Sequence, residues 1–242
     1  MTNSFMREEM LIGKDALKKL GNSHVAVFGI GGVGSFVCEA LARAGVGKFT
    51  LIDNDTVSQS NINRQLIALT STIGELKTKV MKNRILDINP ECEVREINEF
   101  YLPENAHRIH LEQFDYVVDC IDTVSGKISL IERTFEEKIN IISSMGTGNK
   151  LRGDLLKISD IYSTTVCPLA RVIRKECKNR GIDKLKVLYS EEEPIKQSLE
   201  SCEKTNSGRP VPGSISFVPS VAGLLIAGEV IRDLIQYNNN VR

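Results

Sequence analysis

The sequence predicts an α/β fold: a Rossmann-like, doubly wound and mostly parallel sheet with an antiparallel C-terminal continuation. Two observations support this prediction. Short apolar runs rich in β-branched residues alternate with helical segments up to residue 144, and this alternation is typical of a parallel sheet covered by helices. The apolar run at 155–158 breaks the alternation, so it is expected to add an antiparallel strand. A chain of 242 residues is long enough for one large domain.

The first strand and the turn after it predict a phosphate-binding loop. Val25–Phe28 is a short β-branched run of the kind that forms a buried parallel strand. It is followed by Gly29, Gly31, Gly32 and Gly34. Without a Cβ, the backbone can turn sharply and approach a phosphate, and the helix expected at Ser35–Ala44 would point its N-terminal N–H groups at it. A second strand at Phe49–Ile52 ends at Asp53, where a ribose hydroxyl would be bonded.

The residues after Asp53 favour a triphosphate over a dinucleotide. Asn61 and Arg64 lie three residues apart, on one face of a helical turn, and Lys77 lies near the start of the next helix. Cations that converge on a phosphate site suit a triphosphate whose pyrophosphate must leave. A hydride transfer would not need them. For the glycines alone, a tight strand–helix turn without any ligand stays an alternative.

The remaining elements follow from periodicity and from helix breakers. Helical segments are expected at 4–20, 66–69, 76–88, 103–111, 128–138, 168–180 and 218–235, and strands at 92–97, 116–118, 140–144 and 155–158. Pro90 ends the 76–88 helix, because proline disfavours helix in the residue before it. Pro103 can occupy the first turn of a helix. The stretch 204–214 is rich in Gly, Pro, Ser and Asn and is expected to be a crossing loop.

Composition places the chain among soluble globular proteins. It is 41% hydrophobic and 26% charged. No apolar run approaches the roughly 20 residues of a membrane span, and the N-terminus lacks the pattern of a secretory signal, so a cytoplasmic protein is expected. The six cysteines form no Cys-x-x-Cys pair, which argues against a four-thiolate zinc site.

Two aspartates follow the strand at 116–118. Ligands of open parallel sheets bind beyond the carboxyl ends of the strands, where Asp122 falls. A carboxylate at this place could hold Mg²⁺ on a triphosphate. Asp119 is expected to be a helix-cap or turn residue instead.

The helix expected at 168–180 carries a basic face, although the formal net charge of the chain is zero. That face consists of Arg171, Arg174, Lys175 and Lys178. Seven cations stand against two acids between residues 171 and 186. Such a concentration of positive charge could bind RNA phosphates. From charge alone, a solvated helix flank is the alternative.

Taken together, these motifs resemble those of the ubiquitin-activating-enzyme-like (ThiF-type) adenylyltransferases. The resemblance rests on Gly-Ile-Gly-Gly-Val-Gly at 29–34, Asp53-Asn-Asp55, Ser60-Asn-Ile-Asn-Arg64-Gln65, Gly74-Glu-Leu-Lys77 and Asp119-Cys-Ile-Asp122. Within that superfamily, the segments 40–47, 84–92 and 217–223 resemble the tRNA threonylcarbamoyladenosine dehydratases. Related molybdopterin and thiamine adenylyltransferases commonly carry two Cys-x-x-Cys pairs, and this chain has none.

The resemblance implies a set of site residues, with ATP and Mg²⁺ as cofactors and a monovalent cation left open. Nucleotide-binding residues would be the four glycines with Asp53, Asn54, Asp55, Ser60, Asn61, Arg64, Lys77, Asp122 and Thr123. Catalytic residues would be Arg7, Arg64, Lys77 and Asp122. Arg7 would reach the triphosphate of a neighbouring protomer, and Asp122 would hold the metal. Residues 1–150 would form the nucleotide-binding half of a single adenylating domain, and residues 151–242 the half that faces the tRNA.

The implied reaction is the ATP-dependent dehydration of N6-threonylcarbamoyladenosine at position 37 of tRNA. The threonyl carboxylate would be adenylated, and the carbamoyl group of the same nucleoside would then attack the activated carbonyl and expel AMP. A tethered nucleophile reaches effective molarities of about 10⁵ M or more, so no catalytic cysteine is needed. Cys167 stands where relatives often have an acid, in Cys-Pro-Leu-Ala in place of Asp-Pro-Leu-Ala, and it is assigned no role.

The implied partners are a tRNA and a second copy of the chain, with a sulfur-relay protein left open. The main alternative is an adenylyltransferase that activates the C-terminus of a ubiquitin-like sulfur carrier. A non-catalytic nucleotide-binding module and an NAD-binding protein are weaker alternatives. The missing Cys-x-x-Cys pairs and the basic face favour the tRNA reaction. The sequence does not indicate which tRNAs are used or which ring isomer forms.

Overall fold

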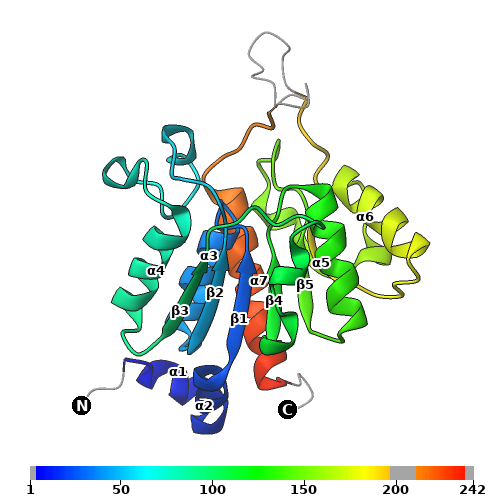
Figure 1. Ribbon diagram of the computed structural model, residues 1–242. Helices are drawn as coiled ribbons and strands as arrows, with labels where there is room; N and C mark the ends of the chain where they lie inside the picture. Colours follow the sequence, from blue (N-terminus) through cyan, green and yellow to red (C-terminus); the bar gives the residue numbers. More distant parts are fainter. Residues whose placement is uncertain (1–3, 197–210, 238–242) are drawn as a thin grey trace.

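The computed structural model describes residues 4–196 and 211–237 (Figure 1). Within these residues, seven strands form one sheet in the order β3-β2-β1-β4-β5-β7-β6. The strands are β1 (His24–Phe28), β2 (Lys48–Ile52), β3 (Glu93–Ile97), β4 (Tyr116–Asp119), β5 (Ile141–Ser144), β6 (Leu156–Asp160) and β7 (Lys186–Ser190). Every neighbouring pair is parallel except β6 and β7. The prediction of a doubly wound, mostly parallel sheet with an antiparallel continuation is therefore confirmed.

Helices cover both faces of this sheet and the end at which β1 begins (Figure 1). They are α1 (Met6–Ile12), α2 (Lys14–Asn22), α3 (Gly34–Arg43), α4 (Lys77–Ile88), α5 (Val124–Glu136), α6 (Pro168–Asn179) and α7 (Phe217–Ile235). Helices α3, α4 and α7 share one apolar core with the sheet, while α5 and α6 pack together on the opposite face. Among the described residues, no helix combines the length and the apolar character needed to cross a membrane.

Two helix predictions were wrong, and a third predicted helical segment is divided into two helices. The expected helix at 4–20 is broken at Gly13, which adopts a φ of 85° between α1 and α2. The segment 103–111 contains only single 3₁₀ turns, because the side chain of Asn105 accepts a hydrogen bond from Leu102 N and donates one to Phe100 O. The segment 66–69 is a turn, and Leu66 N donates to the Ser35 hydroxyl at 3.3 Å. At 103–111, local bonds between a side chain and the backbone thus take the place of the helical bonding pattern.

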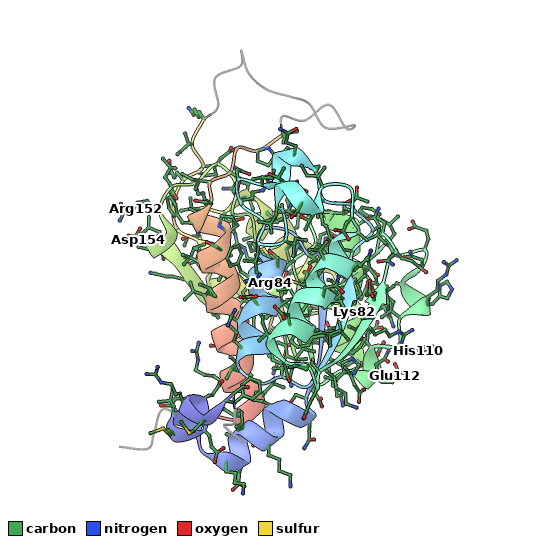
Figure 2. The ribbon with its side chains drawn as sticks, turned by 90° about the vertical axis from the view of Figure 1, so that its left-hand side faces the viewer. Lys82, Arg84, His110, Glu112, Arg152 and Asp154 are labelled. Atoms are coloured by element: carbon green, nitrogen blue, oxygen red, sulfur yellow. The ribbon has the colours of Figure 1, made fainter. Side chains whose placement is uncertain are left out.

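Ion pairs join α4 to its neighbours through Lys82 and Arg84, which are labelled in Figure 2. Arg84 lies 2.6 Å from Glu39 on α3, and Lys82 lies 2.9 Å from Glu96 on β3. These contacts hold the helix that begins at Lys77 against the sheet.

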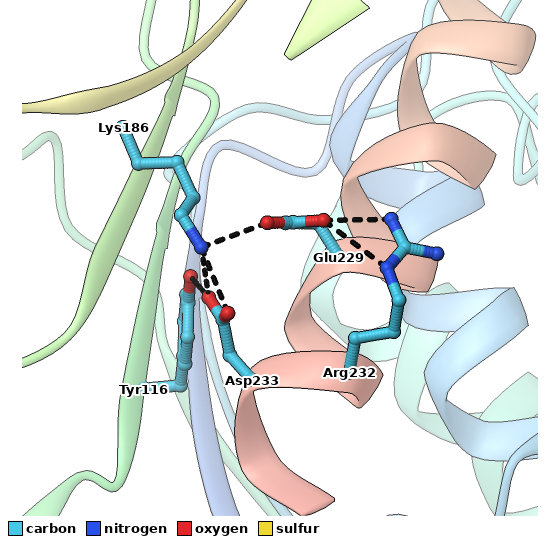
Figure 3. Close-up of polar contacts among 5 residues, drawn as sticks. All are labelled: Tyr116, Lys186, Glu229, Arg232 and Asp233. Atoms are coloured by element: carbon cyan, nitrogen blue, oxygen red, sulfur yellow. Dashed lines mark hydrogen bonds and ion pairs between the residues drawn. The ribbon is translucent and has the colours of Figure 1, made fainter. Parts of the chain in front are cut away.

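A second polar network holds α7 against the sheet (Figure 3). Lys186 on β7 lies 2.6 Å from Asp233 and 2.8 Å from Glu229, both on α7. The Tyr116 hydroxyl on β4 donates to Asp233 at 2.6 Å, and Arg232 pairs with Glu229. Lys186 therefore points into the fold, away from the basic face predicted for residues 171–186.

Candidate active site

A cavity of about 610 Å³ lies beyond the carboxyl ends of the parallel strands. This is where ligands of open α/β sheets bind, and its size is within the usual range for small-molecule sites. Ten of the predicted site residues line it: Gly29, Gly31, Gly32, Asp53, Asn54, Asp55, Arg64, Lys77, Asp122 and Thr123. The fold thus brings together residues from five separate stretches of the chain.

The glycine loop has a shape that side chains would not permit. Gly29 adopts a φ of 88°, and a Cβ placed on it would lie 2.6 Å from Cys120 O. A Cβ on Gly34 would lie 1.9 Å from Gly29 O, so the loop can close onto the first turn of α3 only with glycine at both positions. Gly34 itself lies beneath the loop and does not line the cavity.

Asp53 braces this loop from the end of β2. Its two carboxylate oxygens accept hydrogen bonds from Ile30 N at 2.7 Å and from Asp55 N at 2.9 Å. Each oxygen keeps a further lone pair. The carboxylate therefore positions the loop and can still accept a hydroxyl hydrogen bond from a ribose.

Two cations stand on the walls of the cavity. Lys77, the first residue of α4, is nearly buried, and its Nζ lies 2.6 Å from Asp55 Oδ2. The Arg64 guanidinium donates from Nη1 to Ser60 O at 2.9 Å and to Asn63 Oδ1 at 3.0 Å. Because a guanidinium has five donors, Arg64 keeps several N–H groups for a phosphate.

Asp122 opens into the cavity from the turn between β4 and α5. Its side chain is accessible to solvent, yet the surrounding protein raises the pKa of its carboxyl by desolvation, and the charges of Lys127, Lys77 and Arg64 oppose this shift. Across the part of the chain that the structure describes, no group of three or more His, Cys, Asp or Glu side chains could hold a metal by itself. A metal at Asp122 would need ligands from outside the protein.

A buried ion pair lies under the turn that carries Asp122. Lys127 Nζ lies 2.8 Å from Asp119 Oδ2 and 3.0 Å from Ser144 O, and both charged side chains are fully buried. Ser143 also donates to Asp119, at 2.6 Å. Asp119 Oδ1 accepts from Ile121 N at 3.0 Å, which confirms the turn role predicted for Asp119. The sequence offered no signal for Lys127, because only the tertiary structure buries it.

Besides Gly34, three predicted residues of the nucleotide site lie outside the cavity wall. Asn61 Oδ1 accepts from Ser58 N at 3.1 Å, and Asn61 O accepts from Arg64 N at 3.1 Å, so Asn61 shapes the turn that presents Arg64. Ser60 shares a hydrogen bond with Ser58 at 3.0 Å. Arg7 lies on α1, at the opposite end of the sheet from the cavity (Figure 1). Direct contact of Ser60, Asn61 or Arg7 with a nucleotide stays a prediction.

The basic face of α6 is narrower than the sequence indicates. Arg174 is half-buried and donates to Thr164 O at 2.7 Å, and Arg180 pairs with Glu176 at 2.5 Å. Arg171, Lys175 and Lys178 are exposed, and among the described residues they form no ion pair. These three cations are the part of the face that is available to a polyanion.

Sequence reasoning missed two polar side chains in the cavity wall. Gln65 Oε1 and the Tyr101 hydroxyl are buried, and within the described structure neither has a hydrogen-bond partner. Tyr101 packs edge-on against Phe28, with ring centroids 5.0 Å apart. Buried polar atoms are normally bonded, so both side chains are suited to contact a ligand. Gln65 could have been found from its place directly after Arg64, whereas Tyr101 carries no such signal.

Comparisons with known proteins agree with this geometry. The model of the ThiF family matches residues 5–242. The tRNA threonylcarbamoyladenosine dehydratase of Bacillus subtilis (strain 168) is 44% identical, over 98% of this chain and 96% of the relative. The enzyme of that name from Haemophilus influenzae is 47% identical over 66% of this chain and 61% of the relative. The crystal structure of Escherichia coli tRNA N6-threonylcarbamoyladenosine dehydratase, TcdA, in complex with ATP has a TM-score of 0.87 and 31% identity, over 96% of this chain and 94% of that one. The chain belongs to the ThiF family.

Proposed function

We propose that this protein is the ATP-dependent dehydratase of N6-threonylcarbamoyladenosine in tRNA. One observation carries the proposal: a single cavity joins a glycine loop, two cations and Asp122 to a further compartment beside α6. The B. subtilis dehydratase matches nearly the whole chain, and the E. coli dehydratase of known structure shares the fold and binds ATP. In this proposal residues 1–150 bind the nucleotide and residues 151–242 face the tRNA.

The first step would activate the threonyl carboxylate. A free carboxylate is a poor electrophile, because its leaving group would be oxide. When a carboxylate oxygen attacks the α-phosphorus of ATP, a mixed anhydride forms and pyrophosphate leaves. Arg64 and Lys77 would balance the charge that develops on the phosphates. Arg7 of a second protomer would add a third cation, which makes a homodimer part of the proposal.

Asp122 is suited to hold Mg²⁺ on the triphosphate. Mg²⁺ usually keeps several waters and binds through one or two carboxylates together with substrate phosphates. The exposed Asp122 carboxylate lines the cavity and fits that pattern, since phosphates and waters would supply the other ligands. The bound ion would neutralise phosphate charge as pyrophosphate departs. A monovalent cation stays open, because no residue of the described site requires one.

The second step would close the ring. The carbamoyl group of the nucleoside would bond to the activated acyl carbon, and AMP and a proton would be released. Because the nucleophile is tethered to the acyl group, positioning supplies much of the rate. Cys167 lines the cavity, but the reaction needs no thiol.

Three exposed cations of α6 would guide the tRNA. Arg171, Lys175 and Lys178 lie on the helix whose first residues line the cavity. Contacts to the phosphate backbone would position the substrate without reading its sequence. Arg174 would act indirectly, since it holds the Thr164 segment. A tRNA substrate would place the protein in the cytoplasm, and a sulfur-relay partner stays open.

Incubation of the protein with ATP, Mg²⁺ and bulk tRNA, followed by nucleoside mass spectrometry, tests the proposal. The modified nucleoside should lose one water, and the loss should depend on ATP and on Arg64 and Asp122. If pyrophosphate is released only when a ubiquitin-like sulfur carrier replaces the tRNA, the alternative adenylyltransferase function is correct. Failure to release pyrophosphate with either substrate would leave a nucleotide-binding module.

A further inference from the structure

The cavity extends beyond Asp122 into a second region, called here the α6 compartment and defined by its lining residues at 145–150, 167–169 and 212. Its wall runs along the loop at 145–150 after β5 to Cys167–Leu169 at the start of α6 and to Pro212. The loop is held in place by Asn149, whose N donates to Gly213 O at 2.7 Å and whose Oδ1 accepts from Gly213 N at 2.7 Å. A Cβ on Gly148 would lie 2.8 Å from Pro212. These contacts give this part of the cavity wall a defined shape.

Lys150 is the charged side chain that this loop buries. Only 4% of Lys150 is exposed, although it lines the cavity. Its Nζ donates to the backbone carbonyl of Glu192. The Glu192 carboxylate faces elsewhere and accepts from Leu151 N at 2.9 Å and from Arg152 N at 2.8 Å. Within the described residues, Lys150 has no carboxylate at ion-pair distance.

The other buried lysines show how unusual this arrangement is. In the described part of the chain, three lysines are buried: Lys77, Lys127 and Lys150. Lys77 pairs with Asp55 at 2.6 Å, and Lys127 pairs with Asp119 at 2.8 Å. Buried charges are normally paired, because desolvation penalises a lone ion. Burial accordingly lowers the pKa of Lys150.

We propose that Lys150 binds the carboxylate of the acyl substrate, which under the proposed function is the threonyl carboxylate of the tRNA nucleoside. The ammonium group supplies the positive half of an ion pair, and the substrate supplies the anion that no described residue provides. Arg64 and Lys77 stand beside the glycine loop, where the phosphates belong, so the site separates its two anions between two sets of cations.

The same contact acts through both steps. One carboxylate oxygen attacks the α-phosphorus and pyrophosphate leaves, while Lys150 holds the other oxygen. That second oxygen becomes the carbonyl oxygen of the mixed anhydride. When the carbamoyl group bonds to the acyl carbon, negative charge collects on this oxygen until the bond to AMP breaks. An ammonium group already in place stabilises that charge.

The test compares Lys150→Met with Arg152→Met. Arg152 is a matched control, because it lies two residues away and its side chain points outward to pair with Asp154 at 2.5 Å (Figure 2). For tRNA that carries the modified nucleoside, Lys150→Met should lower kcat/KM by about 10- to 100-fold, the usual effect of losing a hydrogen bond to a charged group. ATP affinity should stay within about twofold, and Lys150→Arg should recover part of the activity.

A binding measurement on the wild-type protein needs no variant. Calorimetry with a non-hydrolysable ATP analogue present should show that N-carbamoyl-L-threonine binds more tightly than its methyl ester, and Lys150→Met should lose this preference. Unfolding by urea should show that Lys150→Met is no less stable than wild type, since it replaces a buried ion that has no carboxylate partner among the described residues. If Lys150→Met does not fold like wild type, its kinetics are set aside. The comparison of acid and ester binding to the wild-type protein then decides whether the site binds a carboxylate.

Several outcomes would overturn the proposal. One is an unchanged kcat/KM in Lys150→Met, and another is equal binding of acid and ester by the wild type. A loss of ATP affinity that equals the loss for tRNA would assign Lys150 to the phosphates instead. If wild-type protein dehydrates no tRNA, the proposed function fails on its own. Preference for the acid over the ester, lost in Lys150→Met, would then still support a carboxylate site.

Discussion

The Nζ of Lys77 lies 2.6 Å from Asp55 Oδ2, and this pair fixes a cation at the edge of the nucleotide cavity. Helix α4 begins at Lys77, and Lys77 N donates to Asp55 O at 3.0 Å, so backbone and side chain are both held by the same aspartate. The ammonium group therefore needs little reorganisation when phosphate charge develops beside it.

Replacing Lys77 with methionine should reduce the rate of pyrophosphate release by about 10²–10³-fold, the usual effect of removing one group that stabilises developing charge. Stability should change little, because Asp55 is exposed and water can solvate its carboxylate. Asp55→Asn serves as the control: it keeps the cation but frees it from its partner, so its effect should be smaller. Equal rates for wild type and Lys77→Met would remove Lys77 from the mechanism.

The buried pair of Asp119 and Lys127 should be a major stabilising element. Lys127→Met leaves the Asp119 carboxylate buried without its cation, and such a change is expected to cost about 3–5 kcal/mol in the free energy of unfolding. Urea denaturation measures it. The double variant Asp119→Asn/Lys127→Met should lose less than the sum of the single variants, because the two residues interact directly. Strict additivity would show that the ion pair is not coupled.

Asp122 should set a pH dependence. Desolvation raises the pKa of its carboxyl, and metal binding requires the ionised form. Activity should therefore fall on acidification at a pH above the ordinary aspartate value of about 3.9. Measuring the rate of pyrophosphate release as a function of pH would locate this fall in activity. Asp122→Asn should abolish activity at every pH.

The raised pKa of the Asp122 carboxyl should also make the stability of the fold depend on pH. A folded-state pKa above the unfolded value means that folding favours the protonated carboxyl, so this contribution is present at low pH and is lost as the pH rises through the folded pKa. Asp122→Asn should consequently be more stable than wild type at neutral pH and equal to it in acid. Thermal melting at several pH values measures the difference. A variant that is less stable at neutral pH would contradict the shift.

The exposed cations of α6 should contribute to tRNA affinity through phosphate contacts. Each of Arg171→Ala, Lys175→Ala and Lys178→Ala should weaken binding at low salt and reduce the slope of log K against log salt by about one. Arg180→Ala should leave the slope unchanged, because Glu176 already neutralises this side chain. Filter binding at several salt concentrations would show the contrast. If Arg180→Ala changed the slope as much as Lys175→Ala, the exposed face of α6 would not be the tRNA-binding surface.

Part of this molecule follows from local rules in the sequence. The run Val25–Phe28, the glycines after it and Asp53 combine a strand period, a backbone requirement and a spacing, so the nucleotide loop could be found without coordinates. The helix expected at 103–111 shows where such rules fail. A single side chain, Asn105, bonds the nearby backbone and replaces the helical pattern.

By itself, the sequence determined most of the strands and helices, although not β7, together with the glycine loop and the residue types around it, because these depend on periodicity and on chemistry that neighbours along the chain share. Only the tertiary structure decided which charged side chains are buried and which partners they contact. It placed Lys186 against α7, gave Lys127 its aspartate and left Lys150 in the cavity, where a backbone carbonyl is its hydrogen-bond partner among the described residues. Burial and pairing arise from segments far apart in sequence, and electrostatic energies depend on the distances that the fold sets between them.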